Sequence, residues 1–426
     1  MRIFKPKWID FTILTFILFF VSPTQAATTN IETRVSGLNE FAFALYKQIG
    51  QSDKNLILSP YSLSSLLIVL MDGAAGNTRV QLSHLLHLED KKDSNNMEML
   101  NKIDSELMQN TCTGWFQCNI IRVTKRLGFD KKNPIFLIAN SLWSDESFSY
   151  KETFLDTMKQ NKSTQFYRVD FNTSPESAKN TINRWVEDKT NNYIKQLIPQ
   201  GAITSSTKLI LVNAIYFKGL WELPFKPENT TQKPFLLSNG QTIQTAMMVQ
   251  EDKFLYSENN NLQMLQLPYS KSTLAMAILL PKANHKIQEI QQELNQQLFS
   301  QLLQTTHKQT VEVNIPRFKL VSTFDSLDQT LQKLGLTDPF SEKANFANIS
   351  DSPLAISKII QKAIIQVDEK GTVAAAATAS IMYATAYQPP VQFNANHPFL
   401  LILYDTKSNV ILFIGQVTNP QEAVAP

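Results

Sequence analysis

The sequence predicts an α+β fold in one domain. Apolar residues recur at helical spacing through the first part of the chain, whereas runs of β-branched and aromatic residues are frequent in the second part. The chain has 426 residues, of which 43% are apolar and 18% are charged, and it shows neither an internal repeat nor a linker-like stretch. Helices and strands that are segregated in this way, without a linker, favour a single α+β domain.

The N-terminal segment has the features of a signal peptide over residues 1–26. Its basic residues are Arg2, Lys5 and Lys7. The apolar run from Phe11 to Val21 has 11 residues, well short of the ~20 that a membrane span requires. Small and polar residues lead to Ala26, so we expect cleavage after Ala26 and not a membrane anchor. This interpretation predicts an exported protein, extracellular or periplasmic, whose mature domain covers residues 27–426.

Helices are predicted in order through the first part of the mature chain. One face of the first helix carries Leu38, Phe41, Leu45 and Ile49. Ser59 is a suitable N-cap, and Pro60 suits the first position of a second helix. The residues that follow are apolar on nearly every side, so this helix should be buried and should end near Gly73. Two further helices are predicted over residues 78–88 and 96–109.

Strands become frequent from residue 135 onward. Runs of β-branched and aromatic residues predict strands over residues 135–139, 209–212, 214–217 and 364–367. Helical spacing predicts helices over residues 150–160, 175–197 and the glutamine-rich stretch 286–304. Two strand pairs are predicted near the end, over residues 262–280 around a turn at Lys271–Ser272, and over residues 399–417 around a turn at 405–409.

One segment does not fit this pattern of ordinary elements. The predicted strand 364–367 leads to Gly371, which can release the backbone, and then to a run of small residues. In an extended conformation alternate side chains share a face. One face would then carry only small, uncharged side chains: Thr372, Ala374, Ala376, Thr378 and Ser380. Such a segment can fit between two strands without a clash, so we interpret it as a loop that can become a strand.

The alanine run in this segment also has a simpler interpretation. Alanine has the highest helix propensity, so a helix or a plain linker is the alternative. Three features favour the strand-forming loop, namely the strand signal upstream, the hinge at Gly371 and the turn signal at Pro389–Pro390. Composition alone leaves both interpretations open.

The charge balance gives no support for a nucleic-acid or membrane partner. Removing residues 1–26 takes away three positive charges and one negative charge, so the formal net charge falls from +3 to about +1. One basic cluster comprises Arg122, Lys125, Arg126, Lys131 and Lys132. Its usual meaning is a solvated surface, and a polyanion site is the alternative. We expect a monomer that binds neither nucleic acid nor a membrane.

Neither a metal site nor a catalytic site is predicted. Cys112 and Cys118 are the only cysteines, and in an exported protein such a pair favours a disulfide. His84 and His87 lie three residues apart, but no third ligand is near them in the sequence. The nucleophile-elbow, zinc-protease, P-loop and dinucleotide-binding motifs are missing. We therefore expect no cofactor, no metal and no enzyme activity.

Three motifs stand out along the chain, Asn55–Ser62, Leu211–Trp221 and Phe393–Phe399. They resemble motifs of the serpin family, and the likeness covers roughly residues 37–420. The third resembles the family's signature after its reactive loop. The motifs occur in the family's order, and the hinge at Gly371 lies between the second and the third, so together they are specific.

The resemblance implies about nine helices, three β-sheets and an exposed reactive centre loop at about residues 369–391. In inhibitory serpins a protease cleaves this loop, its nucleophile is esterified to the residue before the cut, and the freed loop inserts into the large central sheet. The resemblance thus implies an exported suicide inhibitor of serine endopeptidases. The alternative is a serpin-fold protein that does not inhibit and acts as a carrier, chaperone or binding module.

The loop can be matched to the family residue by residue. Its hinge corresponds to Glu369, Gly371, Thr372, Ala374, Ala375, Ala376 and Ala377. Val373 replaces the usual glutamate, but its side chain would face away from the inserted face. The family's usual spacing places the scissile bond at Thr385–Ala386, and the neighbouring candidates are Tyr383, Ala384 and Tyr387. Thr or Ala before the cut suggests an elastase-like or subtilisin-like target and Tyr a chymotrypsin-like one; a cysteine protease is a further class.

The resemblance also implies two polar clusters around the central sheet. At the top of the sheet, in the family's breach, Glu369 should pair with Arg317 above Trp221. The shutter, which controls sheet opening, corresponds to Ser59, Ser62, Asn213 and Gln361. Gln361 replaces a histidine that is usual there, and glutamine both donates and accepts hydrogen bonds, so the network can persist without a pH-dependent opening.

Overall fold

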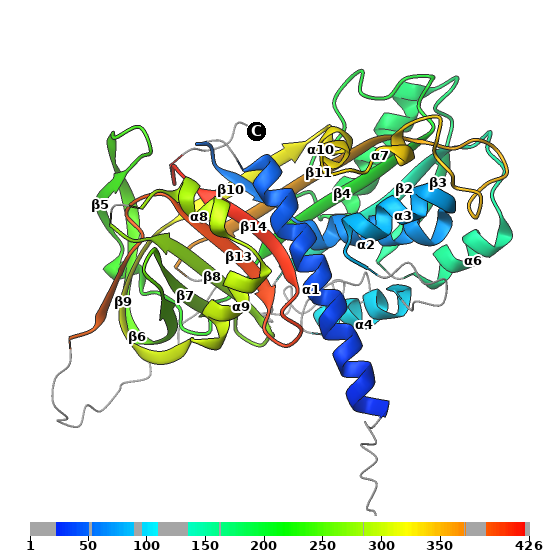
Figure 1. Cartoon of the computed structure of the whole chain (residues 1–426). Coiled ribbons are helices and arrows are strands. Elements are labelled where there is room, and N and C mark those ends of the chain that lie inside the picture. Colours follow the sequence, from blue (N-terminus) through cyan, green and yellow to red (C-terminus); the bar gives the residue numbers. More distant parts are fainter. Residues whose placement is uncertain are drawn as a thin grey trace, which may run out of the picture.

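The computed structural model describes residues 23–50, 53–88, 96–109, 135–161, 163–283, 285–369, 371 and 389–421. These residues form nine α-helices, two short 3-10 helices and fourteen β-strands, which confirms the predicted α+β class. The strands form two sheets, and helices pack against both of them (Figure 1). The α-helices are α1 (Pro23–Ile49), α2 (Pro60–Gly73), α3 (Gly76–Leu85), α4 (Asn96–Gln109), α6 (Glu152–Gln160), α7 (Pro175–Lys189), α8 (Ile287–Glu293), α9 (Gln296–Gln304) and α10 (Leu327–Lys333).

The five-stranded sheet has the order β10-β11-β4-β2-β3. Its strands are β2 (Ile135–Asp145), β3 (Thr164–Val169), β4 (Leu209–Lys218), β10 (Phe318–Phe324) and β11 (Ile356–Val367). The two central strands, β11 and β4, run parallel, with Gln361 opposite Asn213 and Ile365 opposite Phe217. The flanking pairs β10–β11 and β2–β4 are antiparallel. Since parallel pairing is slightly less stable per residue, the boundary between β4 and β11, here called the seam, is weaker than the ladders beside it.

The second sheet has nine strands. They are β1 (Leu56–Leu58), β5 (Thr231–Leu236), β6 (Thr242–Glu258), β7 (Leu262–Pro268), β8 (Leu274–Pro281), β9 (His307–Pro316), β12 (Val391–Asn394), β13 (Phe399–Asp405) and β14 (Ile411–Val417). The third sheet that the resemblance implies is not separate among the described strands. The reason is β6, which is 17 residues long and pairs with β5 at one end, β7 at the other and β9 between them, so one continuous ladder forms.

Two apolar cores lie on opposite faces of the five-stranded sheet. Ile215, Phe217 and Ile365 belong to the main core, which also contains α2 and the strands of the nine-stranded sheet. The alternate residues of the same two strands belong to the second core, under α7: Val212, Ala214, Tyr216, Ile360 and Ile364. The period of two along a strand separates these sets. A strand added at the seam would therefore have both of its faces buried.

The predicted helix starts are accurate, but two predicted helices are too long. Ser59 caps α2, accepting a hydrogen bond from Ser62 N, and Pro60 occupies the first turn as expected. The predicted helix 175–197 ends at Lys189, because Asn191 and Asn192 adopt left-handed backbone angles that a helix cannot continue. The predicted helix 286–304 is two helices, α8 and α9, because Asn295 leaves the helical conformation and caps α9 by accepting from Leu298 N.

Several predicted features lie outside the described residues. These are residues 1–22 of the predicted signal peptide, Cys112 and Cys118, the basic cluster at 122–132, and residues 372–388 of the predicted reactive loop. Helix α1 begins at Pro23, four residues before the predicted cleavage site at its Ala26–Ala27 bond. Among the helices of the described part, none is both long and apolar enough to cross a bilayer.

Candidate functional site

A row of side-chain amides crosses the centre of the five-stranded sheet. Gln361 on β11 lies opposite Asn213 on β4, and Asn213 lies opposite Asn140 on β2. Side chains that are opposite one another in a ladder share a face, so these three, here called the amide row, project together toward α2. All three are at most 3% exposed. The seam runs through this row, between Gln361 and Asn213.

The N-terminal turn of α2 contacts the amide row on both sides of the seam. The Gln361 side chain bonds both backbone groups of Ser59: its Oε1 accepts from Ser59 N at 3.0 Å, and its Nε2 donates to Ser59 O at 2.9 Å. On the other side, Ser62 Oγ donates to Asn140 Oδ1 at 2.7 Å, and Asn213 Nδ2 donates to Ser62 Oγ and to Asn140 Oδ1. One helix start thus holds β11 and β4 together.

The amide row contains one unsatisfied acceptor. Asn213 Oδ1 is completely buried and has no hydrogen-bond partner in the described structure. A buried acceptor without a partner costs about 1–3 kcal/mol. Ser59 Oγ, by contrast, donates to Leu412 O at 2.7 Å and is satisfied. This energetic cost therefore arises at the seam, and a hydrogen-bond donor placed between β4 and β11 would remove it.

Gly371 lies against the chain segment that follows β4. Its φ is 58°, in the left-handed region, and a Cβ there would lie 2.3 Å from Trp221 N and 2.6 Å from Gly219 O. Trp221 Nε1 donates to Asp368 O at 3.0 Å, and the indole stacks on Tyr269 with ring centres 4.5 Å apart. Only glycine fits this position, and the backbone beyond β11 is held at the top of the seam.

Glu369 is buried beside the same turn and is held by three groups. Its carboxylate accepts hydrogen bonds from the Arg317 guanidinium and from the Thr230 hydroxyl, and its carbonyl accepts from Phe225 N at 2.9 Å. Burial raises the pKa of the Glu369 carboxyl, but the hydrogen bonds from Arg317 and Thr230 outweigh this, so its pKa lies below the ordinary value of 4.5. Glu369 is therefore ionised at neutral pH and joins β11, β10 and the segment before β5.

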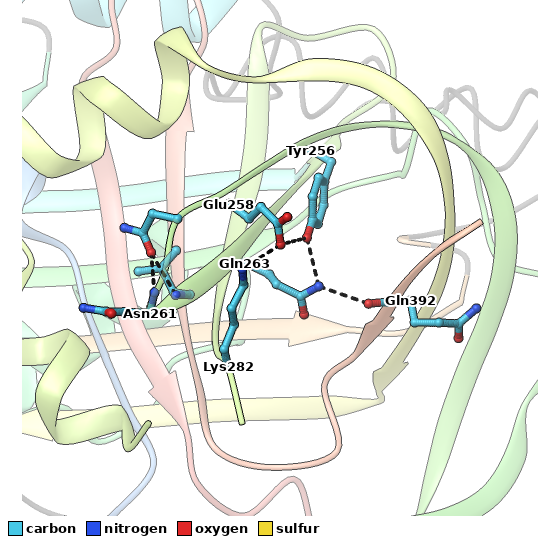
Figure 2. A network of polar contacts seen from close by, with 8 residues as sticks. Tyr256, Glu258, Asn261, Gln263, Lys282 and Gln392 are labelled. Atoms are coloured by element: carbon cyan, nitrogen blue, oxygen red, sulfur yellow. Dashed lines mark hydrogen bonds and ion pairs between the residues drawn. The ribbon is translucent and has the colours of Figure 1, made fainter. Parts of the chain in front are cut away.

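The chain returns from the undescribed residues 372–388 into β12, which is anchored by a second network (Figure 2). Gln263 Nε2 donates to Gln392 O at 3.1 Å and to Tyr256 Oη at 2.9 Å. Tyr256 Oη donates to Glu258 Oε2 at 2.8 Å, and Lys282 Nζ lies 2.9 Å from the same oxygen. Since β12 pairs with β9 along one edge, Gln263 supplies a hydrogen bond on its other edge. Both ends of the undescribed segment are thus fixed to the body.

The predicted site residues that the structure describes form two clusters. Ser59, Ser62, Asn213 and Gln361 meet at the seam, and Glu369, Gly371, Trp221 and Arg317 meet at its top. The predicted residues Thr372, Ala374 to Ala377, Thr385 and Ala386 lie outside the described residues. Sequence reasoning missed Asn140, Thr230 and Tyr269. Only Asn140 gave a signal, as a polar residue next to the apolar run 135–139.

The chain is similar in sequence and in structure to known proteins. A family model described as Serpin (serine protease inhibitor) matches residues 36–420. An uncharacterized serpin-like protein of Methanosarcina acetivorans is 36% identical over 386 residues, which cover 90% of this chain and 85% of that protein. The leukocyte elastase inhibitor of Sus scrofa is 32% identical over 391 residues, 89% of this chain and 97% of that protein. A structure of native protease nexin-1 with heparin is similar with a TM-score of 0.78 and 28% identity, covering 92% of this chain and 100% of that one.

Proposed function

Because this chain belongs to the serpin family, we propose that it is an exported suicide inhibitor of serine endopeptidases. The observation that carries the proposal is the seam, where two parallel strands meet across the amide row directly below the glycine turn. Cleavage near Thr385–Ala386 would free the segment after Gly371, which then inserts at the seam. The inhibitor acts as a monomer and needs neither a cofactor nor a metal.

The geometry of the seam suits a strand that folds back from β11. A chain that turns at Gly371 runs antiparallel to β11 and, since β4 is parallel to β11, antiparallel to β4 as well. Insertion therefore replaces one parallel ladder by two antiparallel ladders, which are the more stable kind. Asp368, Glu369 and Gly371 are already arranged as a turn, in which Gly371 N donates to Asp368 O at 3.1 Å.

The register of such a hairpin fits the sequence of the loop. A four-residue turn over 368–371 pairs Val367 with Thr372, and it then pairs Gln361 with Thr378. Ala374 and Ala376 fall opposite the main-core residues Ile365 and Ala363, so small side chains meet apolar ones. Thr378, the polar member, enters the amide row between Gln361 and Asn213. Its hydroxyl is the donor that Asn213 Oδ1 lacks.

The protease is trapped only if the loop inserts faster than the acyl-enzyme ester is hydrolysed. The protease serine Oγ attacks the carbonyl carbon of Thr385, the bond to the nitrogen of Ala386 breaks, and the new amino group leaves with the proton. The ester now links the protease to the inserting strand. A dozen new ladder hydrogen bonds at ~1 kcal/mol each release on the order of 10 kcal/mol. Losing one oxyanion-hole donor costs a protease roughly 2.7–4 kcal/mol, so insertion can disable the enzyme before water hydrolyses the ester.

The same energetics require the uncleaved protein to be a kinetic trap. The intact loop is tied at both ends, by the Glu369 contacts and by β12, so it cannot insert fully while its sequence is continuous. Such a state is maintained by a barrier and not by equilibrium. The anchors at the two ends are accordingly part of the mechanism.

The target class follows from the residue before the cut. Threonine there suits elastase-like and subtilisin-like proteases, and a cut after Tyr383 would suit a chymotrypsin-like one. The relative named leukocyte elastase inhibitor supports the elastase-like class. A cysteine protease is a further target that the same ester chemistry, as a thioester, would allow.

The proposal is tested by mixing the mature chain with elastase, subtilisin and chymotrypsin and running denaturing gels. We expect an SDS-stable adduct with at least one of them, and N-terminal sequencing of the released C-terminal fragment should begin at Ala386. Clean cleavage without an adduct would favour the alternative, a non-inhibitory carrier, chaperone or binding module. The cleaved chain should also melt at a higher temperature than the intact chain, and equal melting temperatures would overturn the insertion mechanism.

A further inference from the structure

A segment without helix or strand, residues 190–198, contacts the seam on the face opposite the amide row and is here called the crossing segment. The ring of Tyr193 stacks on Tyr216 of β4, with ring centres 4.0 Å apart and an angle of 11° between the ring planes. Two residues later, Lys195 O accepts a hydrogen bond from Lys362 Nζ of β11 at 3.3 Å. The crossing segment therefore contacts both strands of the seam.

Helix α7 holds both ends of the crossing segment. At its start, Thr190 Oγ1 donates to Val186 O at 2.7 Å and accepts from Ile194 N at 3.2 Å. At its end, the Asn183 side chain bonds both backbone groups of Ile198, at 2.8 Å to N and 2.9 Å to O. The side chains of Ile194 and Ile198 are buried in the second core. A segment that is fixed in this way cannot follow β4 and β11 independently.

An added strand would separate the two contacts of the crossing segment. Neighbouring strands lie ~4.8 Å apart, so a strand inserted at the seam would move β4 and β11 to about 9.6 Å apart. Tyr193 and Lys195 are two residues apart, which corresponds to at most about 7 Å of extended chain. On this face the proposed register places Ala377 opposite Lys362, in the space that the crossing segment covers. The two contacts therefore cannot both keep their present geometry after insertion.

The two contacts differ in what they contribute to the closed seam. Burial lowers the pKa of the Lys362 ammonium, so covering this charge has a cost that opposes the gain from its bond to Lys195 O. A stacked aromatic pair, by contrast, contributes beyond the area that it buries. Tyr193 is 46% exposed, so its ring has Tyr216 on one side and solvent access on the other. The stack is therefore the stronger of the two contacts.

We propose that Tyr193 is a positioning residue that holds the crossing segment over the closed seam and thereby sets how fast a strand can insert there. Its ring must leave Tyr216, or the segment must leave β11, before the seam can widen. Weakening the stack should speed insertion without any change in the loop or in the amide row. This inference rests on the proposed function, because it concerns insertion at the same seam.

The test measures how fast the intact mature chain takes up a synthetic peptide with the sequence of residues 372–385, followed by native gel electrophoresis. We expect Tyr193→Ala to take up the peptide about two- to tenfold faster than wild type, the range that the loss of one aromatic pair predicts. Tyr193→Phe keeps the stack and should match wild type. Leu236→Ala is the matched control, since Leu236 is 48% exposed and lies on β5 in the other sheet, and it should leave the rate unchanged.

The melting temperatures before and after peptide uptake separate this role from a general loss of stability. A Tm that is lower for Tyr193→Ala than for wild type before uptake, and equal to it afterwards, supports the role of Tyr193; the same loss in both forms refutes it. Equal uptake rates for wild type and Tyr193→Ala would overturn the inference and leave insertion at the seam intact. Uptake by neither protein would overturn insertion itself, and with it both the inference and the proposed function.

Discussion

The centre of the five-stranded sheet differs from strands β8, β13 and β14 of the nine-stranded sheet in strand pairing and in how completely its buried polar groups are hydrogen-bonded. In the nine-stranded sheet, β8, β13 and β14 are buried along their whole length and pair antiparallel with one another. In the five-stranded sheet, the central strands meet in parallel, a polar row crosses them, and Asn213 Oδ1 lacks a partner. Strands β8, β13 and β14 have a neighbouring strand on each side and contain no unsatisfied buried acceptor. The centre of the five-stranded sheet has both the weaker ladder and an acceptor that an added strand can satisfy.

The two sheets also hold opposite ends of the predicted reactive loop. The nine-stranded sheet holds β12 through β9 and the network around Gln263, so it fixes the C-terminal end of the reactive segment. The five-stranded sheet holds the N-terminal end through Glu369 and Gly371, directly above the seam. In the proposed mechanism, a cut between these two anchors would leave the N-terminal part of the loop attached beside the seam, where it could insert.

The largest expected effect tests whether the seam accepts the loop. Thr372→Arg would place a cation on the face that packs on the main core, where an unpaired charge is very costly. We expect the SDS-stable adduct to fall at least tenfold, while the loop is still cleaved. Val373→Arg is the matched control, because the adjacent side chain points to the opposite face, where its partner in the register is the half-buried Gln366 at the end of β11, so the arginine can reach solvent. Equal adduct yields for wild type and Thr372→Arg would contradict insertion at the seam.

The next prediction concerns the nine-stranded sheet, which the proposed insertion leaves unchanged. Leu401 lies at the centre of β13, fully buried between Ile278 and Gly415 on the neighbouring strands. Leu401→Ala should lower the free energy of unfolding by about 2–5 kcal/mol. Since the proposed insertion leaves this sheet unchanged, the loss should be equal for intact and nicked protein in urea titrations. A loss that differed between the two forms would mean that the nine-stranded sheet also rearranges.

Gln361→Ala gives the corresponding test at the seam. It removes both hydrogen bonds to the Ser59 backbone, which is buried, and should cost the intact protein about 2–3 kcal/mol. The nicked protein should lose less, because the inserted strand then separates β11 from β4 and adds its own ladders on both sides. Gln361→Glu keeps the acceptor for Ser59 N but would bury a carboxylate against Ser59 O, so at neutral pH it should cost the intact protein more than alanine does. If Gln361→Ala lowered the free energy of unfolding equally in the intact and the nicked protein, the five-stranded sheet would respond to cleavage no differently from the nine-stranded sheet.

Local signals in the sequence predicted the parts of this site that are local in structure. The Ser59–Pro60 helix start, the turn at Lys271 and the Gly371 hinge each depend on a few adjacent residues, and the structure has all three. Strand extents were predicted poorly for a physical reason. The strands β2 and β11 continue through Asn140 and Gln361, beyond the predicted runs 135–139 and 364–367, because a polar residue such as Asn140 or Lys362 ends an apolar pattern.

Pairing between distant segments could not be predicted from composition. β6 and β9 carry mixed polar and apolar residues, since one of their faces is exposed, and they gave no strand signal. The Thr230 contact with Glu369 joins residues 139 positions apart, and no local pattern indicates it. The family resemblance supplied Arg317 and Trp221 as site residues, whereas it assigned no role to Thr230 and Tyr269, which were missed.

The smallest expected effect concerns the charge at the top of the seam. The pKa of Glu369 is lowered in the folded protein, so its contribution to stability is present above the ordinary value of 4.5 and is lost as pH falls through the lower folded value. Glu369→Gln should cost about 1–2 kcal/mol at pH 7, a modest figure because Arg317 is half-exposed and its ion pair is screened. The difference between wild type and Glu369→Gln in urea titrations should shrink as the pH falls below 4.5. Glu228→Gln, at an exposed position on the 3-10 helix Pro227–Asn229, is the matched control and should leave the free energy of unfolding at pH 7 unchanged. A difference that stays constant from pH 7 to pH 3 would mean that the carboxylate charge does not hold the hinge, and that Gly371 and Trp221 anchor it alone.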